Sequence, residues 1–399
     1  MTKSYITAKR AIIGDGKTVI NPVWIGIDGN KIVYIGSKKP EEATERNTYD
    51  AGDATLTPGF FNLHDHVNRK MLRDEVSDIP VGIRSKAFST NPPEYLILHG
   101  ANNVHNMLKE GITFVRDFGL GYYTAVSLQR AIKEGIVIGP EMMICAQSIC
   151  MTGGHCHTTA KEASGVEGVM QVVREVIKAG ANFIKFMASG GLENFPKEDP
   201  RYPEFTEAEL RAGIEVAHDA GLETTAHAYP TAAILRILKA GIDCVEHGVL
   251  LDEECLGLMV KNNIPLVPTM SGIRGSNFIP PISEASWKKI ELLEKRIFAP
   301  HAVSVRMAIE AGLLVGTGTD SYGRLADEIR MIAKAAELNP VQAIAHATSI
   351  SAKIVHREDL GLLAEGKHAN IAAFAGDVTK SLDSINQATQ LWLHGKAML

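Results

Sequence analysis

Residues 182–191 read Asn-Phe-Ile-Lys-Phe-Met-Ala-Ser-Gly-Gly, an apolar run with one lysine, Lys185, near its middle. Side chains alternate along a β-strand, so Phe183, Lys185 and Met187 share one face, and apolar side chains occupy the other. A strand with two apolar faces is covered on both sides. Because burial disfavours a charged amine, we expect Lys185 to be neutral or chemically modified. The alternative is an ammonium that reaches the strand end and pairs with a carboxylate.

Short apolar runs of this kind alternate with helix-length segments from Leu56 onward. This alternation is typical of βα units whose strands form a parallel sheet. Eight units predict an α/β fold in which the sheet closes into a (β/α)8 barrel of the TIM type. The runs lie near residues 59–63, 113–117, 142–146, 183–188, 223–227, 244–247, 265–268 and 314–318. A helix is expected after the last run, at residues 340–355.

Both ends of the chain instead carry short strand-like stretches separated by turn signals. Glycine and aspartate at residues 14–16 and 28–30 mark turns, and strand-like stretches return at 371–374 and 390–394. We therefore expect one accessory β-sandwich built from residues 1–57 plus 361–399, beside a barrel domain at residues 58–360.

Composition narrows the classes of partner. The chain has 399 residues, 45% hydrophobic and 22% charged, and its net charge of -5 predicts no basic surface for nucleic acid or an anionic membrane. We therefore expect a small-molecule substrate. The N-terminus has no signal-peptide pattern and no run is long enough to cross a membrane, so a cytoplasmic location is expected. Five cysteines in so long a chain indicate reduced thiols.

Residues of the metal-ligating types stand at the ends of several predicted strands. In a barrel these ends meet at one face, where functional groups gather. Taken singly, each is more often a core histidine or a capping aspartate, but together they predict a metal site. They are His64 and His66 at the first run, Lys185 on the fourth, His227 and His247 ending the fifth and sixth, and Asp320 after the eighth.

This set resembles the amidohydrolase superfamily in its binuclear-metal form, and the resemblance covers nearly the whole chain. Residues 184–191 and 152–155 resemble the prolidase-like branch, whose members hydrolyse dipeptides, including Xaa-Pro dipeptides, and N-acyl amino acids. The resemblance implies two divalent metal ions. Zinc suits the histidine-rich ligand set, and manganese and cobalt are the alternatives for the same site. It also implies a homo-oligomer.

The resemblance further implies a role for each ligand. His64 and His66 would hold the buried metal, and His227 and His247 the more exposed one. Lys185, carbamylated by carbon dioxide, would bridge both, which accounts for a lysine in an apolar strand. Asp320 would ligate the first metal and take the proton of the bridging hydroxide, which attacks the amide carbonyl.

Other reactions compete with amide hydrolysis. The same centre would serve a carbamate, urea or ester hydrolase, because hydroxide attack on those carbonyls needs the same groups. A mononuclear deaminase is less favoured, since it needs a carboxylate soon after the fifth-strand histidine, where Tyr229, Pro230 and Thr231 stand. A non-catalytic scaffold would have lost ligands, and this chain retains all six.

Tyr229, His155 and His157 are candidate substrate-binding residues. Tyr229 lies two residues after His227, and its hydroxyl is placed to stabilise the developing oxyanion, although a tyrosine there also serves simply to pack. His155 and His157, after the third strand, would contact a substrate carbonyl or carboxylate. The alternative is a separate metal site with Cys150 and Cys156, but their spacing fits no standard zinc pattern.

A substrate carboxylate would need a cation near the barrel mouth. Most charged loop residues are simply solvated, so each candidate taken alone is expected to be neutral to function. The candidates are Arg69, Lys70, Arg274 and Arg324, which all follow strand ends. The segment 69–93 is also long for a loop, which indicates a functional excursion.

Overall fold

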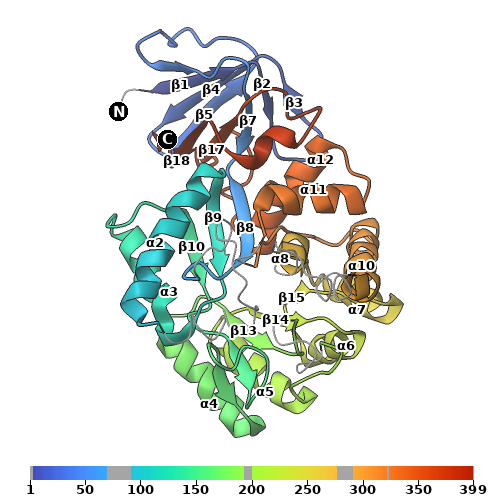
Figure 1. Cartoon of the computed structure of the whole chain (residues 1–399). Coiled ribbons are helices and arrows are strands. Elements are labelled where there is room, and N and C mark those ends of the chain that lie inside the picture. The colour runs from blue at the N-terminus through green and yellow to red at the C-terminus, as the bar shows by residue number, and fades with distance from the viewer. Residues whose placement is uncertain (1–2, 70–90, 193–199, 276–290, 321–322, 399) are drawn as a thin grey trace.

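The computed structural model describes residues 3–69, 91–192, 200–275, 291–320 and 323–398 (Figure 1). Two sheets of parallel strands carry the central part of the chain. One has the order β10-β9-β8, with β8 (Phe60–Asp65), β9 (Ile112–Asp117) and β10 (Glu141–Ile144). The other has the order β12-β11-β13-β14-β15-β16. Its strands are β11 (Ile149–Met151), β12 (Lys161–Ala163), β13 (Ile184–Met187), β14 (Thr224–Ala228), β15 (Cys244–His247) and β16 (Leu266–Val267).

Backbone hydrogen bonds link the ends of these two sheets. Asn182, just before β13, donates to the carbonyl of Ile144 in β10 at 2.7 Å. The eighth apolar run, residues 314–318, makes one isolated parallel bridge from Val315 to Leu266 instead of a regular strand. Two glycines in this run weaken a strand, which accounts for the difference. Thr317 in the same run accepts a 2.7 Å bond from the backbone of Leu63 in β8.

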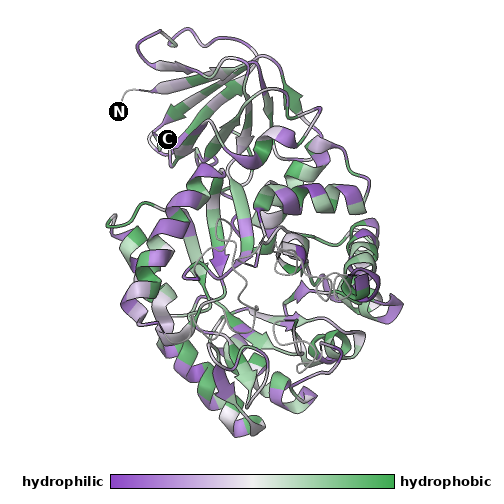
Figure 2. Ribbon diagram, viewed as in Figure 1, coloured by the Kyte–Doolittle hydropathy of each residue, from purple (hydrophilic) through white to green (hydrophobic). Residues whose placement is uncertain are grey.

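Helices follow most of the parallel strands and lie outside them in Figure 1. Within the described ranges, no helix combines the length and apolar character needed to cross a membrane. Figure 2 shows that helices carry both hydrophobic and hydrophilic residues, as expected when one face packs inward. The longer helices are α2 (Pro93–Lys109), α3 (Thr124–Lys133), α4 (Gly165–Lys178), α5 (Glu207–Asp219), α6 (Thr231–Ala240), α7 (Glu253–Asn262), α10 (Ala299–Glu310) and α11 (Leu325–Ala335).

The helix expected at residues 340–355 is interrupted. It consists of α12 (Pro340–Ala345), a π-helical turn (His346–Ile350) and α13 (Ser351–Ile354). From the first residue of α13, the Ser351 hydroxyl donates across the turn to the carbonyl of His346 at 2.5 Å and competes with regular helical hydrogen bonding.

Strands from both ends of the chain share one sheet. Its order is β19-β18-β17-β7-β2-β3, and residues Ile371–Phe374 (β17) pair antiparallel with Thr55–Pro58 (β7). A second sheet has the order β5-β4-β1-β6. Apolar side chains of both sheets meet in one buried cluster that includes Ile6, Leu56 and Trp392. The other strands are β1 (Ser4–Ala8), β2 (Arg10–Ile12), β3 (Val19–Ile20), β4 (Val23–Asp28), β5 (Lys31–Gly36), β6 (Thr48–Asp50), β18 (Gln390–Leu393) and β19 (Lys396–Ala397).

The short helix α8 (Met270–Gly275) is held at its start by a buried carboxyl group from α11. Glu328 accepts hydrogen bonds from the backbone N–H groups of Met270 at 3.1 Å and Ser271 at 2.6 Å. Burial raises the pKa of Glu328 to about 7, and the hydrogen bonds only partly oppose this shift. The carboxyl group is therefore more easily protonated in the folded chain than in the unfolded chain.

A raised carboxyl pKa makes stability depend on pH. Its stabilising contribution is complete below the ordinary glutamate pKa and is lost as pH rises through about 7. At each pH the free energy of unfolding of Glu328→Gln is subtracted from that of the wild type. We expect this difference to fall by about 2–3 kcal/mol between pH 4.5 and 8. Urea unfolding of both proteins across this range measures the difference. Parallel pH profiles would show that Glu328 does not titrate in this window.

Candidate metal centre

His64, His66 and Asp320 form a compact group at the end of β8. Each offers one ligand atom, and these atoms all lie within 4.8 Å of one another. The Nε2 atoms of His64 and His66 lie 3.6 Å and 3.4 Å from the same oxygen of Asp320. In the part of the chain that the structure describes, this is the only group of three or more histidine, cysteine, aspartate or glutamate residues so arranged.

The segment that carries Asp320 is tied directly to β8. The backbone N–H groups of Thr319 and Asp320 both donate to the carbonyl of His64, at 2.9 Å and 2.8 Å. The Thr319 hydroxyl also donates to Asp65 at 2.6 Å, and the Asn62 amide donates to the same carboxylate oxygen. Asp65, between the two histidines, therefore fixes the position of Asp320 relative to them.

Hydrogen bonds at the Nδ1 atoms orient both histidines. His64 Nδ1 lies 2.7 Å from Glu246, and His66 Nδ1 lies 2.7 Å from the carbonyl of Gly119. Each ring therefore turns its Nε2 atom towards Asp320. Burial, together with the charge of Lys185, lowers the pKa of His64 to about 4. The imidazole is thus neutral near pH 7, the form that binds metals.

Asp320 is ionised under the same conditions. Burial alone would raise its pKa, but the hydrogen bond with His66 and the nearby charges of His64, His66 and Arg69 hold the pKa well below its usual range. The group therefore combines imidazole nitrogen donors with an anionic oxygen donor, a set that suits a divalent cation.

Two further histidines adjoin this group. The rings of His227 and His247, at the ends of β14 and β15, are 4.6 Å apart, and His247 lies 4.9 Å from the ring of His64. His247 Nδ1 is 2.6 Å from the Thr269 hydroxyl, and His227 Nε2 is 3.2 Å from the carbonyl of Gly190. Burial lowers the pKa of both histidines well below its usual value.

Lys185 lies in β13, and every residue of this strand is buried. Its Nζ atom sits 4.3 Å from the centre of the Phe118 ring. Among the described residues the amine forms no ion pair, so the alternative of a carboxylate partner at the strand end is not observed. Burial lowers the pKa of Lys185, although Glu246 and Asp320 act in the opposite direction. The amine is therefore more easily deprotonated than an exposed lysine.

A buried ion pair beneath the histidines was not anticipated from the sequence. Arg116 in β9 lies 2.5 Å from Glu246 in β15, and the Thr225 hydroxyl donates to the same carboxylate oxygen at 2.5 Å. Burial opposes ionisation of Glu246, but Arg116 and His64 lower its pKa to about 2. The sequence did contain a sign of this pair, because Arg116 and Glu246 each lie inside an apolar run, at residues 113–117 and 244–247. The same feature drew attention to Lys185.

Two of the proposed substrate-binding residues lie against His227. The Tyr229 ring stacks on His227 with centroids 4.6 Å apart, and the His155 ring lies 4.4 Å from His227. The backbone of His155 donates to the Glu204 carboxylate at 2.8 Å. His157 is instead exposed, with its Nδ1 atom 3.1 Å from the carbonyl of Gly154.

The alternative second metal site is not formed. None of the five cysteines forms a disulfide bond, and Cys150 is buried and Cys156 partly buried. These two cysteines, His155 and His157 all lie within the described residues, and they do not form a compact ligand group.

The four basic candidates have different surroundings. Arg69 is buried, and its charge contributes to the low pKa of Asp320. Arg274, in α8, pairs with Glu294 at 3.2 Å, whereas Arg324 is exposed just before α11. Lys70 lies outside the described residues, as does most of the 69–93 segment.

Comparison with known proteins identifies the family of this chain. Residues 55–398 match the model of the amidohydrolase family. The ochratoxinase of Aspergillus niger is 27% identical, over 98% of this chain and 85% of its own length. The crystal structure of that ochratoxinase superposes with a TM-score of 0.83, 25% identity, and coverage of 99% of this chain and 95% of its own.

Two peptidase structures are similarly close. A Xaa-Pro dipeptidase with bound methionine has a TM-score of 0.85 and 25% identity, with 99% of both chains covered. A prolidase complexed with N-methylphosphonate-L-proline has a TM-score of 0.84 and 26% identity, over 100% of this chain and 99% of its own.

The contribution of the buried Arg116–Glu246 ion pair to stability can be measured with variants. Glu246→Ala leaves Arg116 as an uncompensated buried charge, so we expect the free energy of unfolding to fall by about 3–5 kcal/mol. The double variant Arg116→Met, Glu246→Leu removes both charges. Its loss of unfolding free energy is expected to be much smaller than the summed losses of Arg116→Met and Glu246→Leu made singly.

Urea unfolding of the metal-free proteins measures both effects. The control is Glu134→Ala, which breaks the exposed 2.7 Å pair with Arg130 and is expected to leave stability nearly unchanged. Equal losses for Glu246→Ala and Glu134→Ala would contradict a stabilising role for the buried pair.

Proposed function

Since the chain belongs to the amidohydrolase family and to its prolidase-like branch, we propose that it hydrolyses the amide bond of a dipeptide or an N-acyl amino acid. Its family and its ochratoxinase and prolidase relatives make it a hydrolase of amide bonds. The observation that carries the proposal is the group of His64, His66 and Asp320, with the His227–His247 pair and the buried Lys185 beside it.

The proposed scaffold is a closed (β/α)8 barrel at residues 58–360. The hydrogen bonds from Asn182 to β10, the Val315–Leu266 bridge and the bond between Thr317 and Leu63 support closure. An accessory β-sandwich of residues 1–57 plus 361–399 is the second part of the proposal. It is supported by the sheet that β7 and β17 share and by the apolar cluster between the terminal sheets.

We propose two divalent metal ions, with zinc the best fit to the ligand types. His64, His66 and Asp320 would hold one ion, and His227 and His247 the other. The fit rests on buried imidazoles, two of which turn Nε2 towards an ionised carboxylate. Lys185 would join both ions as a carbamate, formed when its neutral amine adds to carbon dioxide and releases a proton. Its lowered pKa favours the amine form that this addition needs.

The bound ions would polarise the scissile carbonyl and acidify the attacking water. Asp320 would accept the proton of that water at a carboxylate oxygen and deliver it to the leaving amine. The Tyr229 hydroxyl would stabilise the negative charge that develops on the carbonyl oxygen. His155 and His157 are proposed to contact the substrate carbonyl or carboxylate, and the burial of His155 beside His227 makes it the better placed of the two.

Replacement of Asp320 tests the proton transfer. We expect Asp320→Asn to lower kcat by about 10²–10⁴-fold, because the amide cannot accept the proton. Amine release from dipeptides and N-acyl amino acids measures turnover, while circular dichroism and elemental analysis follow the fold and the bound metal. The matched control is Asp219→Asn, at the exposed end of α5.

Two results would oppose the proposal. Unchanged turnover in Asp320→Asn would remove that residue from the proton path. A wild-type protein that holds two metals but hydrolyses only carbamates, ureas or esters would reassign the bond that is cleaved.

Metal removal tests Lys185 independently of activity. Chelated protein reloaded with zinc is expected to regain two ions per chain and full activity only when bicarbonate is present. With ¹³C-labelled bicarbonate, a carbamate signal should appear in the wild type and in the control Lys109→Arg, which replaces a partly exposed lysine, but not in Lys185→Arg. Full metal binding and activity without bicarbonate, and no carbamate signal, would contradict the modification of Lys185.

A further inference from the structure

A buried carboxyl group from α11 reaches the loop that follows β16. Glu328 is fully buried, and its Oε1 and Oε2 atoms accept hydrogen bonds from the backbone N–H groups of Met270 and Ser271, at 3.1 Å and 2.6 Å. Two bonds to one carboxyl group fix both the position and the orientation of the loop, and they are stronger when the group is ionised. The residue just before these two N–H groups is Thr269.

Thr269 has a backbone conformation that its own side chain disfavours. Its φ of +54° lies in the left-handed region, where a β-branched residue is an outlier. Such a conformation costs free energy and persists only when the surrounding contacts impose it. Each of the two residues that follow Thr269 bonds to Glu328, and the Ile273 N–H group donates to the Thr269 carbonyl at 3.1 Å. Glu328 therefore stabilises the strained backbone of Thr269.

In this conformation the Thr269 hydroxyl lies against His247. The hydroxyl oxygen is 2.6 Å from His247 Nδ1 and 2.6 Å from the carbonyl oxygen of Pro268. A carbonyl oxygen only accepts, so the single hydroxyl proton goes to Pro268 and the hydroxyl accepts from His247. Nδ1 therefore carries the proton of the neutral ring, which leaves the free lone pair on Nε2. A metal ion binds the nitrogen without a proton, so Thr269 decides which nitrogen of His247 is the ligand.

The same loop also lies against Asp320. The backbone of α8 comes so close at Gly272 that an added Cβ would lie 2.8 Å from the Asp320 Cβ, and nearer still to the carbonyl oxygen of Thr319. Asp320 has a left-handed backbone as well, with a φ of +46°, so this contact restrains a second strained residue. Residues 269–272 therefore contact both His247 and Asp320, which are proposed ligands of different ions.

We propose that Glu328 and Thr269 are positioning residues of the metal centre. Glu328 fixes residues 269–272. Within this loop, Thr269 selects the ligating nitrogen of His247, and the α8 backbone supports Asp320. The inference rests on the proposed two-metal centre. It follows that the Thr269 hydroxyl acts on one ion only, whereas Glu328 acts on both.

The tautomer of His247 gives the most direct test, because it needs neither bound metal nor turnover. In metal-free protein labelled with ¹⁵N-histidine, the NMR signals lost in His247→Gln identify this ring. We expect the wild type and Thr269→Ser, which keeps the hydroxyl, to carry the proton on Nδ1. Thr269→Val, which keeps the shape without the hydroxyl, should shift the proton towards Nε2 or give a mixture of both forms. An unchanged tautomer in Thr269→Val would overturn the role of Thr269.

Zinc affinity shows whether this selection acts on the centre. Competition with a chelator at pH 8, above the Glu328 pKa of about 7, resolves the two ions. We expect Thr269→Val to weaken one ion about 10–100-fold, the range for a residue that orients a ligand, and to leave the other nearly unchanged. Thr269→Ser should restore binding. Glu328→Gln, whose NH₂ group cannot accept the second backbone bond, should weaken both ions.

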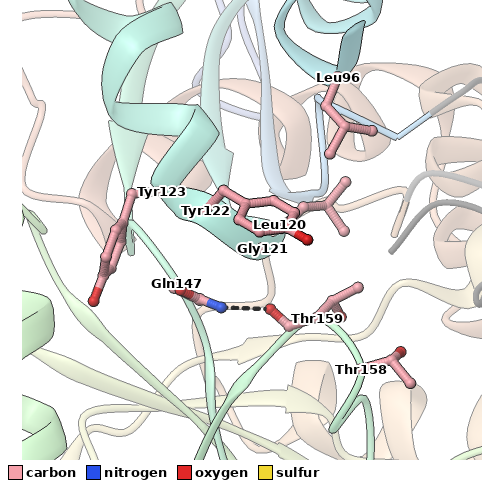
Figure 3. Close-up of a pocket in the computed structure, with 8 residues that line it drawn as sticks. All are labelled: Leu96, Leu120, Gly121, Tyr122, Tyr123, Gln147, Thr158 and Thr159. Carbon is pink, nitrogen blue, oxygen red and sulfur yellow. Dashed lines mark hydrogen bonds between the residues drawn. The ribbon is translucent and has the colours of Figure 1, made fainter. Parts of the chain in front are cut away.

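Two controls remove a threonine hydroxyl elsewhere. Thr348→Val deletes a buried 2.8 Å bond to the carbonyl of Ile344. Thr159→Val changes a residue that lines a cavity of about 320 Å³ beside α2 (Figure 3). Both variants should keep the His247 tautomer and both zinc affinities, although Thr348→Val is expected to lower thermal stability. Equal losses of zinc affinity in Thr269→Val and Thr348→Val would show a merely structural effect and overturn the inference.

The outcomes separate this inference from the proposed function. If the wild type binds no zinc, the two-metal centre and the positioning roles fall together. If it binds two ions, and Glu328→Gln and Thr269→Val bind them as tightly, only the positioning roles are overturned. If two ions bind but no amide is hydrolysed, the proposed function falls, and the tautomer and zinc measurements still decide the roles of Glu328 and Thr269.

Discussion

The carboxylate of Glu246 is the constraint on which the geometry of the metal centre depends. It is fully buried and forms hydrogen bonds with Arg116, the Thr225 hydroxyl and His64, which come from three different strands. A buried charge is tolerated only when its partners satisfy it, so these three side chains have little freedom to move. The contact with His64 fixes the ring that faces Asp320. The Arg116 side chain extends the same restraint to β8 through a 2.8 Å bond to the carbonyl of Leu63.

Phe118 organises the charges above this carboxylate. Its ring stacks on His64 with centroids 3.8 Å apart, while Lys185 Nζ and the Arg116 guanidinium lie 4.3 Å and 5.1 Å from its centre. The ring face attracts cations but supplies no proton acceptor. Arg116 gains Glu246 as a full counterion and Lys185 gains none among the described residues. This difference in counterions explains why Arg116 is expected to stay charged, whereas Lys185 is expected to become neutral readily.

The sequence was most informative where burial and alternation act together. The apolar runs predicted the positions of β8, β9, β13, β14 and β15, because strands covered on both faces tolerate few polar residues. The same reasoning singled out Lys185 and the histidines at the strand ends. It did not identify Arg116 and Glu246 as partners, because pairing between distant strands depends on register. Residues 314–318 were expected to form a strand, but their glycines leave only the bridge at Val315. The break at residues 346–350 depends on a side-chain hydrogen bond that periodicity does not reveal.

The pairing of β7 with β17 has a consequence for how the chain is made. These strands lie near opposite ends of the sequence, yet they are neighbours in one sheet. During synthesis on the ribosome, β7 emerges early, and almost the entire chain is made before its partner β17 emerges. Until then an edge of this sheet has no neighbour to bond with, which is the condition that favours association between chains. The late contact also closes a long loop, so completion of this sheet is expected to be among the slower steps of folding.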